Sequence, residues 1–252
     1  MSKYVAPALD KGLDILEYLS EIKIPQSQGE IAQGLNKSPN ELYRMLVCLE
    51  QRGYLIKSLS SGKYALSLKL YQLSHRHSPI DGLLKSAKPV IEELANVTNQ
   101  SCHLSMIYHG KLMVISQMRS PGPVSLSIEE GSLFPLTKTA SGRVLLAFLD
   151  SDKTQHLLKS DAEFSALSKK DQKLFLMQLE TIKKTGHEIS ESDLTMGVTD
   201  IAVPVGNPDL VTYCALAISS LTSINEKNKS GANFVDKLFE ASNAIKSLIG
   251  EQ

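Results

Sequence analysis

The 252-residue chain has few cysteines, no excess of either charge and no long apolar run, and each absence excludes a class of protein. Cys48, Cys102 and Cys214 are far apart and form no CxxC pair, which argues against a disulfide framework or a zinc ribbon. No apolar run reaches the ~18 residues that a membrane span needs. Residues 1–12 hold no apolar signal segment. We therefore expect a cytoplasmic protein that does not enter a membrane.

Motifs of the common enzyme classes are also missing. The sequence contains no GxGxxG, no P-loop, no GxSxG and no HExxH. Cys102 and His103 are adjacent, and neighbouring residues of a strand point to opposite faces, so the two cannot easily share one metal ion. We expect no catalytic site, no metal and no cofactor.

The net charge of zero conceals a basic segment. Residues 36–70 contain six Lys or Arg against two Glu, a net charge of +4, whereas residues 1–35 contain three Lys against five Asp or Glu. Nucleic-acid phosphates attract such a local basic surface even when the whole chain is neutral.

Local signals predict helices and a tight turn at the start of the chain. Leucines at helical spacing predict an amphipathic helix over residues 7–21. Ser27 and Glu30 match a capping box, in which each side chain bonds the other's backbone amide at a helix start. Asn36 follows this short helix at a position where a tight turn requires positive φ, which Asn tolerates.

A second capping box, formed by Ser38 and Glu41, predicts another helix, which Gly53 ends. Two short β-like runs at 54–57 and 63–66 flank a Ser-Ser-Gly turn and predict a hairpin. The order helix, short helix, turn, helix, hairpin is typical of a winged helix-turn-helix.

In this arrangement the second helix of the pair enters the major groove and the hairpin, or wing, meets the DNA backbone. A helix N-terminus and Lys side chains suit phosphates, Asn suits adenine, and Glu suits the amino group of cytosine. We therefore expect a double-stranded DNA operator as partner, contacted by Lys37, Ser38, Asn40, Glu41, Tyr43, Arg44 and Lys63.

The rest of the chain mixes helices with strands, which predicts an α+β domain with an antiparallel sheet and helices packed on it. We expect a helix from residue 69 that breaks at Ser78-Pro79, followed by a helix over 86–99 and a hairpin over 101–118 around His109-Gly110. Further elements are a strand at 123–131, helices from about 139, 152 and 169, strands near 186–190, 199–206 and 210–220, and a closing helix over 225–249.

Nearly the whole chain resembles an IclR-type bacterial transcriptional regulator. The motifs that carry the resemblance are ALDKGLDILEYL, EIAQGLNKSPNELYRMLVCLEQRGYL, GKYALSLKLYQL, FPLTKTASGRVLLAFL and GVTDIAVPVGNPDLVTYCALAISSL. It implies a winged helix-turn-helix domain over 1–68, a linker helix over 69–85, and a GAF-like effector-binding and oligomerisation domain over 86–252. Members form dimers, often tetramers, respond to small carboxylic or aromatic acids, and either repress or activate.

Two positions depart from the family's DNA-reading pattern. Asn36 stands where many members have Gly, and Asn40-Glu41 stands where many have Ser-Thr. The fold tolerates both changes, but the base preference must differ, and we expect Glu41 to discriminate between bases.

The resemblance also implies an effector pocket around the loop KTASGR and the later strands. Backbone amides of Ala140 and Ser141 at a helix N-terminus would attract an anion; the alternative is a plain capped helix start. Asp200 replaces a frequent Cys and would repel a simple keto acid, so we expect a more apolar or aromatic acid. The full expected set is Leu126, Thr139, Ala140, Ser141, Ser190, Asp200, Ala217 and Ser219.

Two other classes fit parts of this pattern. Some enzymes carry an N-terminal winged helix for dimerisation, but they also need a glycine-rich cofactor loop, which this sequence lacks. A winged helix can also bind protein instead of DNA. The steep loss of DNA affinity with salt, which follows from counterion release, separates that class from a DNA-binding one.

Overall fold

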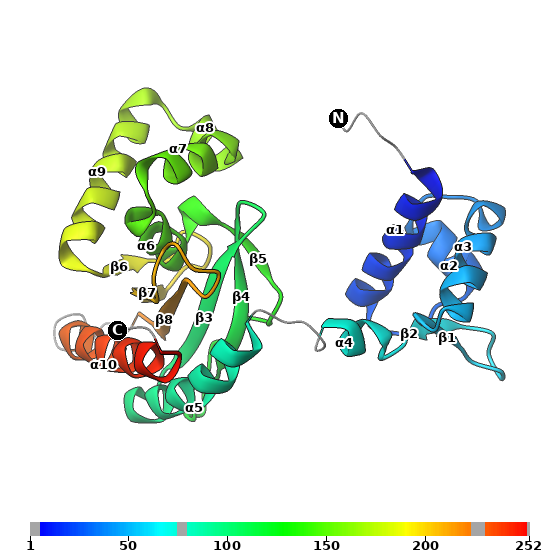
Figure 1. Ribbon diagram of the computed structural model, residues 1–252, viewed down its shortest axis with the longest axis horizontal. Coiled ribbons are helices and arrows are strands. Elements are labelled where there is room, and N and C mark those ends of the chain that lie inside the picture. The colour runs from blue at the N-terminus through cyan, green and yellow to red at the C-terminus, as the bar shows by residue number, and fades with distance from the viewer. Residues whose placement is uncertain (1–5, 75–79, 223–229, 251–252) are drawn as a thin grey trace. The chain divides into compact units, whose positions relative to one another are not determined.

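A computed structural model describes residues 6–74, 80–222 and 230–250 (Figure 1). The chain divides into two compact units, Met1–Ser78 and Pro79–Gln252. The break expected at Ser78-Pro79 and the first residues of the helix expected from Asn225 lie outside the described residues.

The N-terminal unit is a winged helix-turn-helix, as the sequence predicts. Its elements are α1 (Pro7–Ile22), α2 (Gln28–Gly34), α3 (Pro39–Gln51), β1 (Leu55–Lys57), β2 (Tyr64–Leu66) and α4 (Lys69–Ser74). The strands β1 and β2 pair antiparallel and form the wing. One apolar side of α1, α2 and α3 and the first residue of each strand build its core, from Ile15, Leu19, Ile31, Ala32, Leu42, Leu46, Leu55 and Tyr64.

Local chemistry explains the boundaries of α2 and α3. Both helices begin with a complete capping box, Ser27 with Glu30 and Ser38 with Glu41, so the first amides of each helix have partners. Asn36 between them has φ of 52°, the left-handed conformation that turns the chain from α2 into α3.

The C-terminal unit is an antiparallel sheet with helices on both faces. Six strands lie in the order β5-β4-β3-β8-β7-β6. The strands are β3 (Ser101–Tyr108), β4 (Lys111–Met118), β5 (Leu133–Pro135), β6 (Glu188–Glu191), β7 (Val198–Val205) and β8 (Cys214–Leu221). The hairpin of β3 and β4 turns at His109 and Gly110, which both have positive φ, as a tight two-residue turn requires.

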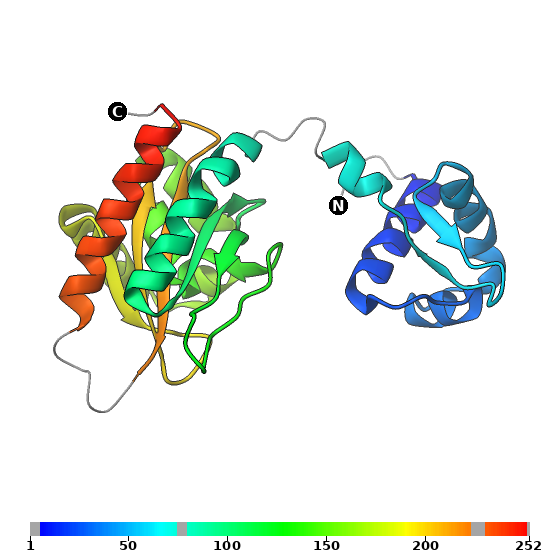
Figure 2. The same ribbon diagram turned by 90° about the horizontal axis from the view of Figure 1, so that it is seen from below.

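Two helices cover one face of this sheet and a group of helices covers the other. Figure 2 shows α5 (Asp81–Thr98) and α10 (Ser230–Leu248) side by side on one face. The opposite face carries α6 (Ala140–Phe148) and α9 (Lys169–Thr185), joined by α7 (Ser151–Ser160) and α8 (Ala162–Ala166). Small side chains let α6 approach the strands closely, because Ala202, Ala215 and Ala217 lie beneath it.

The strand expected over residues 123–131 does not form. This stretch is an irregular loop, and only the following β5 pairs with β4, over Lys111 to Met113. Pro121 and Pro123 open the loop and cannot donate ladder hydrogen bonds. Side chains hold it instead, because Gln117 Oε1 accepts from the Ile128 amide at 3.3 Å. The apolar residues that alternate in this stretch therefore lie on one side of a loop, and that side faces the interior at Leu126 and Ile128.

The boundary expected between residues 85 and 86 lies within a helix. α5 begins at Asp81 and continues to Thr98, and its buried residues start at Leu83. The final part of the expected linker is thus the first turn of a core helix of the C-terminal unit. The division into three parts, with a separate linker helix, stays a prediction.

Candidate functional site

A cavity of about 420 Å³ lies in the C-terminal unit, between the sheet and the start of α6. This volume is in the range of small-ligand sites. Hydrophobic side chains form its walls: Leu112, Val114, Leu126, Ile128, Phe134, Leu194 and Val198. Hydroxyl groups and three ionisable side chains complete it: Ser127, Ser132, Thr139, Ser141, Ser192, Thr195, Ser219, His103, Glu129 and Asp200.

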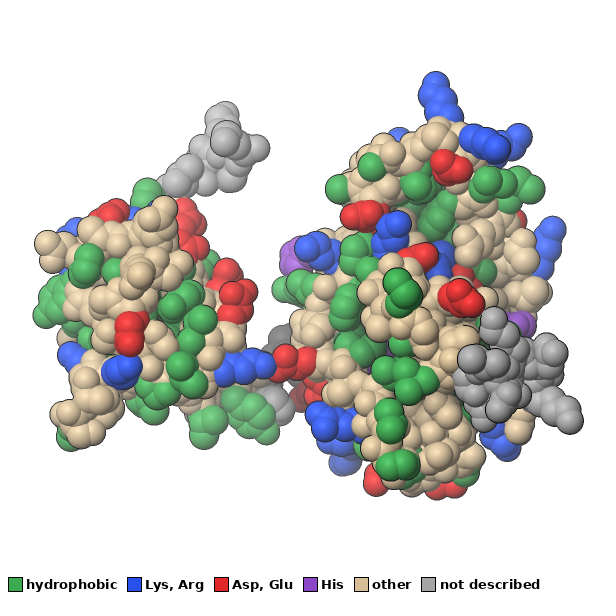
Figure 3. Space-filling model, turned by 180° about the vertical axis from the view of Figure 1, so that it is seen from behind, with side chains coloured by type: hydrophobic (Ala, Val, Ile, Leu, Met, Phe, Trp, Pro, Cys, Tyr) green, Lys and Arg blue, Asp and Glu red, His purple; other side chains and the backbone are tan. Residues whose placement is uncertain are grey.

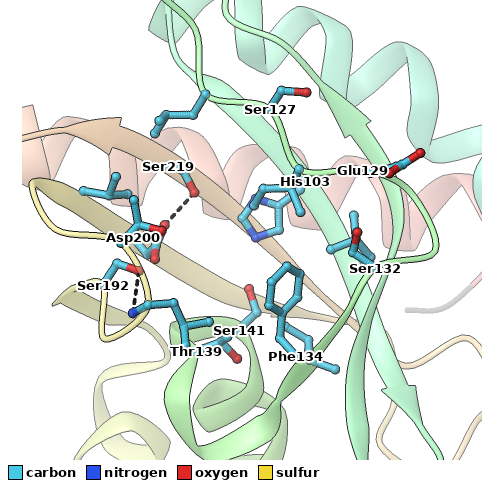
Figure 4. Close-up of a pocket in the computed structure, with 17 residues that line it drawn as sticks. His103, Ser127, Glu129, Ser132, Phe134, Thr139, Ser141, Ser192, Asp200 and Ser219 are labelled. Carbon is cyan, nitrogen blue, oxygen red and sulfur yellow. Dashed lines mark hydrogen bonds between the residues drawn. The ribbon is translucent and has the colours of Figure 1, made fainter. Parts of the chain in front are cut away.

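His103 reaches the cavity because of strand alternation in β3. Its neighbour Cys102 belongs to the core beneath α5 and α10, whereas the His103 ring points to the other face, into the cavity (Figure 4). Burial lowers the pKa of His103, and the negative charge of Asp200 opposes this effect only in part. The ring is therefore neutral at pH 7, with one nitrogen that donates and one that accepts.

Cys102 is not available as a partner for His103. It lies on the opposite face, and burial raises the pKa of its thiol to about 12, so it is protonated at neutral pH. In the part of the chain that the structure describes, no three His, Cys, Asp or Glu side chains gather as metal ligands would.

Asp200 and Ser219 come together because β7 and β8 are paired. Their Cα atoms are register partners, and the Ser219 hydroxyl donates to Asp200 Oδ1 at 2.5 Å (Figure 4). A carboxylate accepts several hydrogen bonds, so Asp200 is an anchored acceptor at the cavity wall.

The start of α6 carries partial positive charge, opposite in sign to the Asp200 carboxylate. Thr139 caps this helix by accepting from the Gly142 amide at 3.1 Å, while Ser141 lines the cavity. Gly142 has to be glycine, because a Cβ there would lie 2.1 Å from the Leu136 carbonyl oxygen. Helix N-termini attract anions through their unpaired amides and the helix dipole.

Five of the eight expected effector residues line this one cavity: Leu126, Thr139, Ser141, Asp200 and Ser219. Three expected residues do not. Ala140 and Ala217 are buried in the core between α6 and the sheet, and Ser190 lies in a separate polar cluster. Ala140 would contribute to the cavity through its backbone amide alone.

The cluster that holds Ser190 is built around the buried side chain of Arg143 on α6. Its guanidinium donates to Glu188 Oε1 at 2.7 Å, Asp193 Oδ2 at 2.9 Å and Ser190 Oγ at 2.9 Å. Burial raises the pKa of Glu188, and the charge of Arg143 opposes that shift. Ser190 is thus a structural partner of Arg143, which also ties down the start of the loop that carries Ser192.

Sequence reasoning missed several residues of the cavity, among them His103, Phe134 and the loop over 192–195. Alternation along β3 places His103 on the face opposite Cys102, and that signal was available. The loop has no periodic pattern, so only the folded chain shows that it lies over the cavity.

The expected DNA-reading surface is the exposed side of α3. Lys37, Ser38, Asn40, Tyr43 and Arg44 are exposed, while Leu42 and Leu46 of the same helix are fully buried. The start of α3 is therefore free to approach a DNA groove.

Glu41 forms the expected capping box and also an ion pair that was not expected. Its Oε2 accepts from the Ser38 amide at 3.0 Å, and its Oε1 accepts from Lys11 Nζ at 2.9 Å. The Ser38 amide and then the Lys11 contact lower the pKa of Glu41 to about 2. Both carboxylate oxygens are engaged within the protein, which weighs against a base-reading role for Glu41.

Lys63 on the wing also has an internal partner, since its Nζ lies 3.1 Å from Glu30 Oε1. A phosphate contact by Lys63 would have to compete with this ion pair. Of the expected DNA contacts, Asn40, Tyr43 and Arg44 keep the strongest structural support.

A winged helix-turn-helix in one unit and a cavity with apolar walls and several polar groups in the other define a two-domain DNA-binding regulator. Comparison with known families gives the same classification. The model of the IclR helix-turn-helix domain matches residues 8–57, and that of the bacterial transcriptional regulator IclR C-terminal domain matches residues 80–247. The chain belongs to the IclR family of bacterial transcriptional regulators, which are not enzymes.

Relatives cover most of the chain. It is 25% identical to the HTH-type transcriptional regulator XynR of Escherichia coli over 98% of both chains. It is 28% identical to KdgR of Dickeya chrysanthemi over 88% of this chain and 73% of that protein. Among solved structures, an IclR homologue from Microbacterium hydrocarbonoxydans complexed with 4-hydroxybenzoate has a TM-score of 0.78 at 18% identity, with 96% of this chain and 98% of that one covered. This last likeness shows the fold alone.

None of the helices within the described ranges combines the length and the apolar character needed to cross a membrane.

Proposed function

We propose that this regulator binds a double-stranded operator through α3 and the wing, and that a small organic acid in the cavity modulates this binding. The cavity carries the proposal. It is enclosed enough to hold a small molecule, and the start of α6, with Ser141, borders it. An anionic group is the natural occupant of a helix N-terminus.

Apolar walls favour an acid with a hydrophobic or aromatic body over a short keto acid. Leu112, Val114 and Phe134 lie where such a body would pack, and Asp200 disfavours a second anionic group. The relative crystallised with 4-hydroxybenzoate supports an aromatic acid as the first compound to test. A thermal-shift screen with 4-hydroxybenzoate, benzoate, pyruvate and glyoxylate tests this, since ligands of the native state raise its melting temperature. Tight binding of glyoxylate or pyruvate alone would overturn it.

We also propose that the protein acts as a homodimer or homotetramer in the cytoplasm. Hydrophobic side chains gather on the face of the N-terminal unit that Figure 3 shows. Leu9 and Leu13 of α1 and Leu70 and Leu73 of α4 are exposed, which supports association of copies. Light scattering on the full chain checks this, and a monomer at micromolar concentration would contradict it.

Arg44 offers a direct test of the DNA-binding face. Duplexes selected from a random pool by the full-length protein serve as the probe, and anisotropy titration measures affinity. Arg44→Ala should cost about 1–3 kcal/mol of binding free energy. Arg52→Ala, at the other end of the same exposed helix, is the matched control and should bind almost like the parent. Equal losses in both variants would contradict the proposed docking of α3.

A further inference from the structure

Two side chains that line the cavity, each more than nine-tenths buried, make no hydrogen bond within the described residues, and their polar atoms border the cavity itself, unlike the enclosed Ser105 Oγ and Glu188 Oε2. The side chains belong to His103, 8% exposed, and Ser141, 2% exposed. Figure 4 shows both pointing into the cavity. Buried polar groups are hydrogen-bonded in nearly all native proteins, and an exception calls for a ligand or a water molecule. These two groups therefore mark where the polar atoms of a ligand are expected.

The ionisable groups around the cavity do not suit a plain acid. No Lys or Arg occurs among its described lining residues, whereas Asp200 and Glu129 contribute carboxylates. Among the described lining residues, Ser141 at the start of α6 combines a hydroxyl donor with a helix N-terminus, and we place the anionic end of a ligand there. A carboxylate near Asp200 would meet like charge, which costs free energy in a partly desolvated site.

Asp200 instead requires a donor. Ser219 already donates to its Oδ1 and holds the carboxylate at the wall, and the neutral His103 ring nearby can donate or accept. A hydroxyl or ammonium group of a ligand would satisfy Asp200, with His103 as second partner. Such a hydrogen bond to a charged group is stronger than one between neutral groups.

We infer that the effector is bifunctional: it carries an acid group, bound at Ser141 and the start of α6, and a separate hydroxyl or amino group, bound by Asp200 and His103. Its carbon frame packs on the hydrophobic wall that includes Phe134 and Val114. This inference rests on the proposed acid effector and narrows it to hydroxy acids or amino acids. Asp200 is then the residue that determines specificity, because a plain acid offers it no hydrogen-bond donor in addition to Ser219.

Matched pairs of acids test this on the full-length protein. One series is benzoate, 3-hydroxybenzoate, 4-hydroxybenzoate and 4-aminobenzoate, and the other is butyrate, 4-hydroxybutyrate and 4-aminobutyrate. Calorimetry and thermal shift measure their affinities. In at least one series, a member with a donor should bind roughly 10- to 100-fold more tightly than the plain acid, the effect of one hydrogen bond to a charged group.

Variants then locate the discrimination. Asp200→Asn keeps the shape of the side chain, and Ser219→Ala removes the anchor of the carboxylate. Both should reduce the preference for the donor-bearing acid over the plain acid to less than roughly threefold. Ser141→Ala should weaken both members of a pair alike. Asp209→Asn changes an exposed carboxylate that pairs with Lys153 outside the cavity, and it should leave the preference intact.

The outcomes distinguish failure of the bifunctional ligand from failure of the acid effector itself. Equal affinity for plain and donor-bearing acids in wild-type protein would overturn the bifunctional ligand and leave the proposed acid effector standing. A preference that survives in both Asp200→Asn and Ser219→Ala would overturn the role of Asp200. Binding of no acid in either series would overturn the inference and the acid effector together.

Discussion

The two units of this protein differ in where their ion pairs lie: the described pairs of the N-terminal unit are all at the surface, whereas the C-terminal unit also has a buried one. In the N-terminal unit, Lys11 and Glu41 meet at the surface, with 27% and 45% of their side chains exposed. In the C-terminal unit, Arg143 and Glu188 meet in the interior, with 5% and 4% exposed. A surface pair contributes little to stability, whereas loss of one member of a buried pair leaves a charge without compensation.

This difference corresponds to what each unit does. The surface pairs of the N-terminal unit hold helix starts and side chains in place beside the proposed DNA-binding face of α3. The buried cluster of the C-terminal unit connects α6 with β6 and with the loop over the cavity. Three experiments test this difference between the units.

Removal of the buried guanidinium should have the largest effect. Arg143→Ala leaves Glu188 and Asp193 without their cation, and we expect a loss of roughly 3–5 kcal/mol of unfolding free energy in the C-terminal unit. Denaturant unfolding monitored by hydrogen exchange measures the unfolding free energy of each unit separately. Lys153→Ala, which breaks exposed pairs with Asp150 and Asp209, is the control and should cost less than about 1 kcal/mol. Similar losses in the two variants would remove the distinction between buried and surface pairs.

A helix cap in the N-terminal unit should have an intermediate effect. Ser38→Ala removes the acceptor for the Glu41 amide, and caps of this kind are worth about 1 kcal/mol. Hydrogen exchange at the start of α3 should speed up while the C-terminal unit is unchanged. Ser20→Ala, on the exposed side of α1, provides the control because its hydroxyl bonds only to the Glu17 carbonyl oxygen. Unchanged exchange in α3 would show that the cap does not hold the helix start.

A fall in pH should have the smallest effect on stability, and the effect should have opposite signs in the two units. The pKa values of Glu30 and Glu41 are lowered from 4.5 to about 2, mainly by the amides of Ser27 and Ser38. Their stabilisation is thus present above pH 4.5 and is lost as the pH falls from 4.5 towards 2. Burial raises the pKa of Glu188, so its contribution is present below pH 4.5 and is lost as the pH rises through its folded value.

Thermal melts of the full chain between pH 2.5 and pH 6 measure this. Glu41→Gln should flatten the pH dependence of the N-terminal unit, whereas Glu50→Gln, later in α3 and outside the cap, should not. An unchanged slope in Glu41→Gln would mean that the cap carboxylate does not control the acid response.

The features that depend on neighbours in sequence could be predicted. The capping boxes of α2 and α3, the left-handed Asn36 and the turn at His109 and Gly110 each depend on residues within one turn of chain, and the structure contains all of them. The expected strand over 123–131 failed because its pattern described a loop held by side chains rather than a paired strand.

The environment of single side chains was harder to predict. Glu41 fits both a cap and a base contact in the sequence, and only the packing of α1 against α3 brings Lys11 to it. Ser190 is the register partner of Asp200 and lies on the same face of the sheet, yet its hydroxyl accepts from Arg143, because α6 brings that guanidinium to β6.

Local signals were sufficient to predict the winged helix-turn-helix, the start of α6 and the family, because periodicity, caps and motifs each depend on short stretches of the chain. That His103, Ser141 and Asp200 share one cavity follows from the folded arrangement alone. They come from β3, α6 and β7, and their meeting requires the strand order in which β8 lies between β3 and β7. Strand order results from the packing of the whole sheet between its helices, and no short stretch of the chain encodes it.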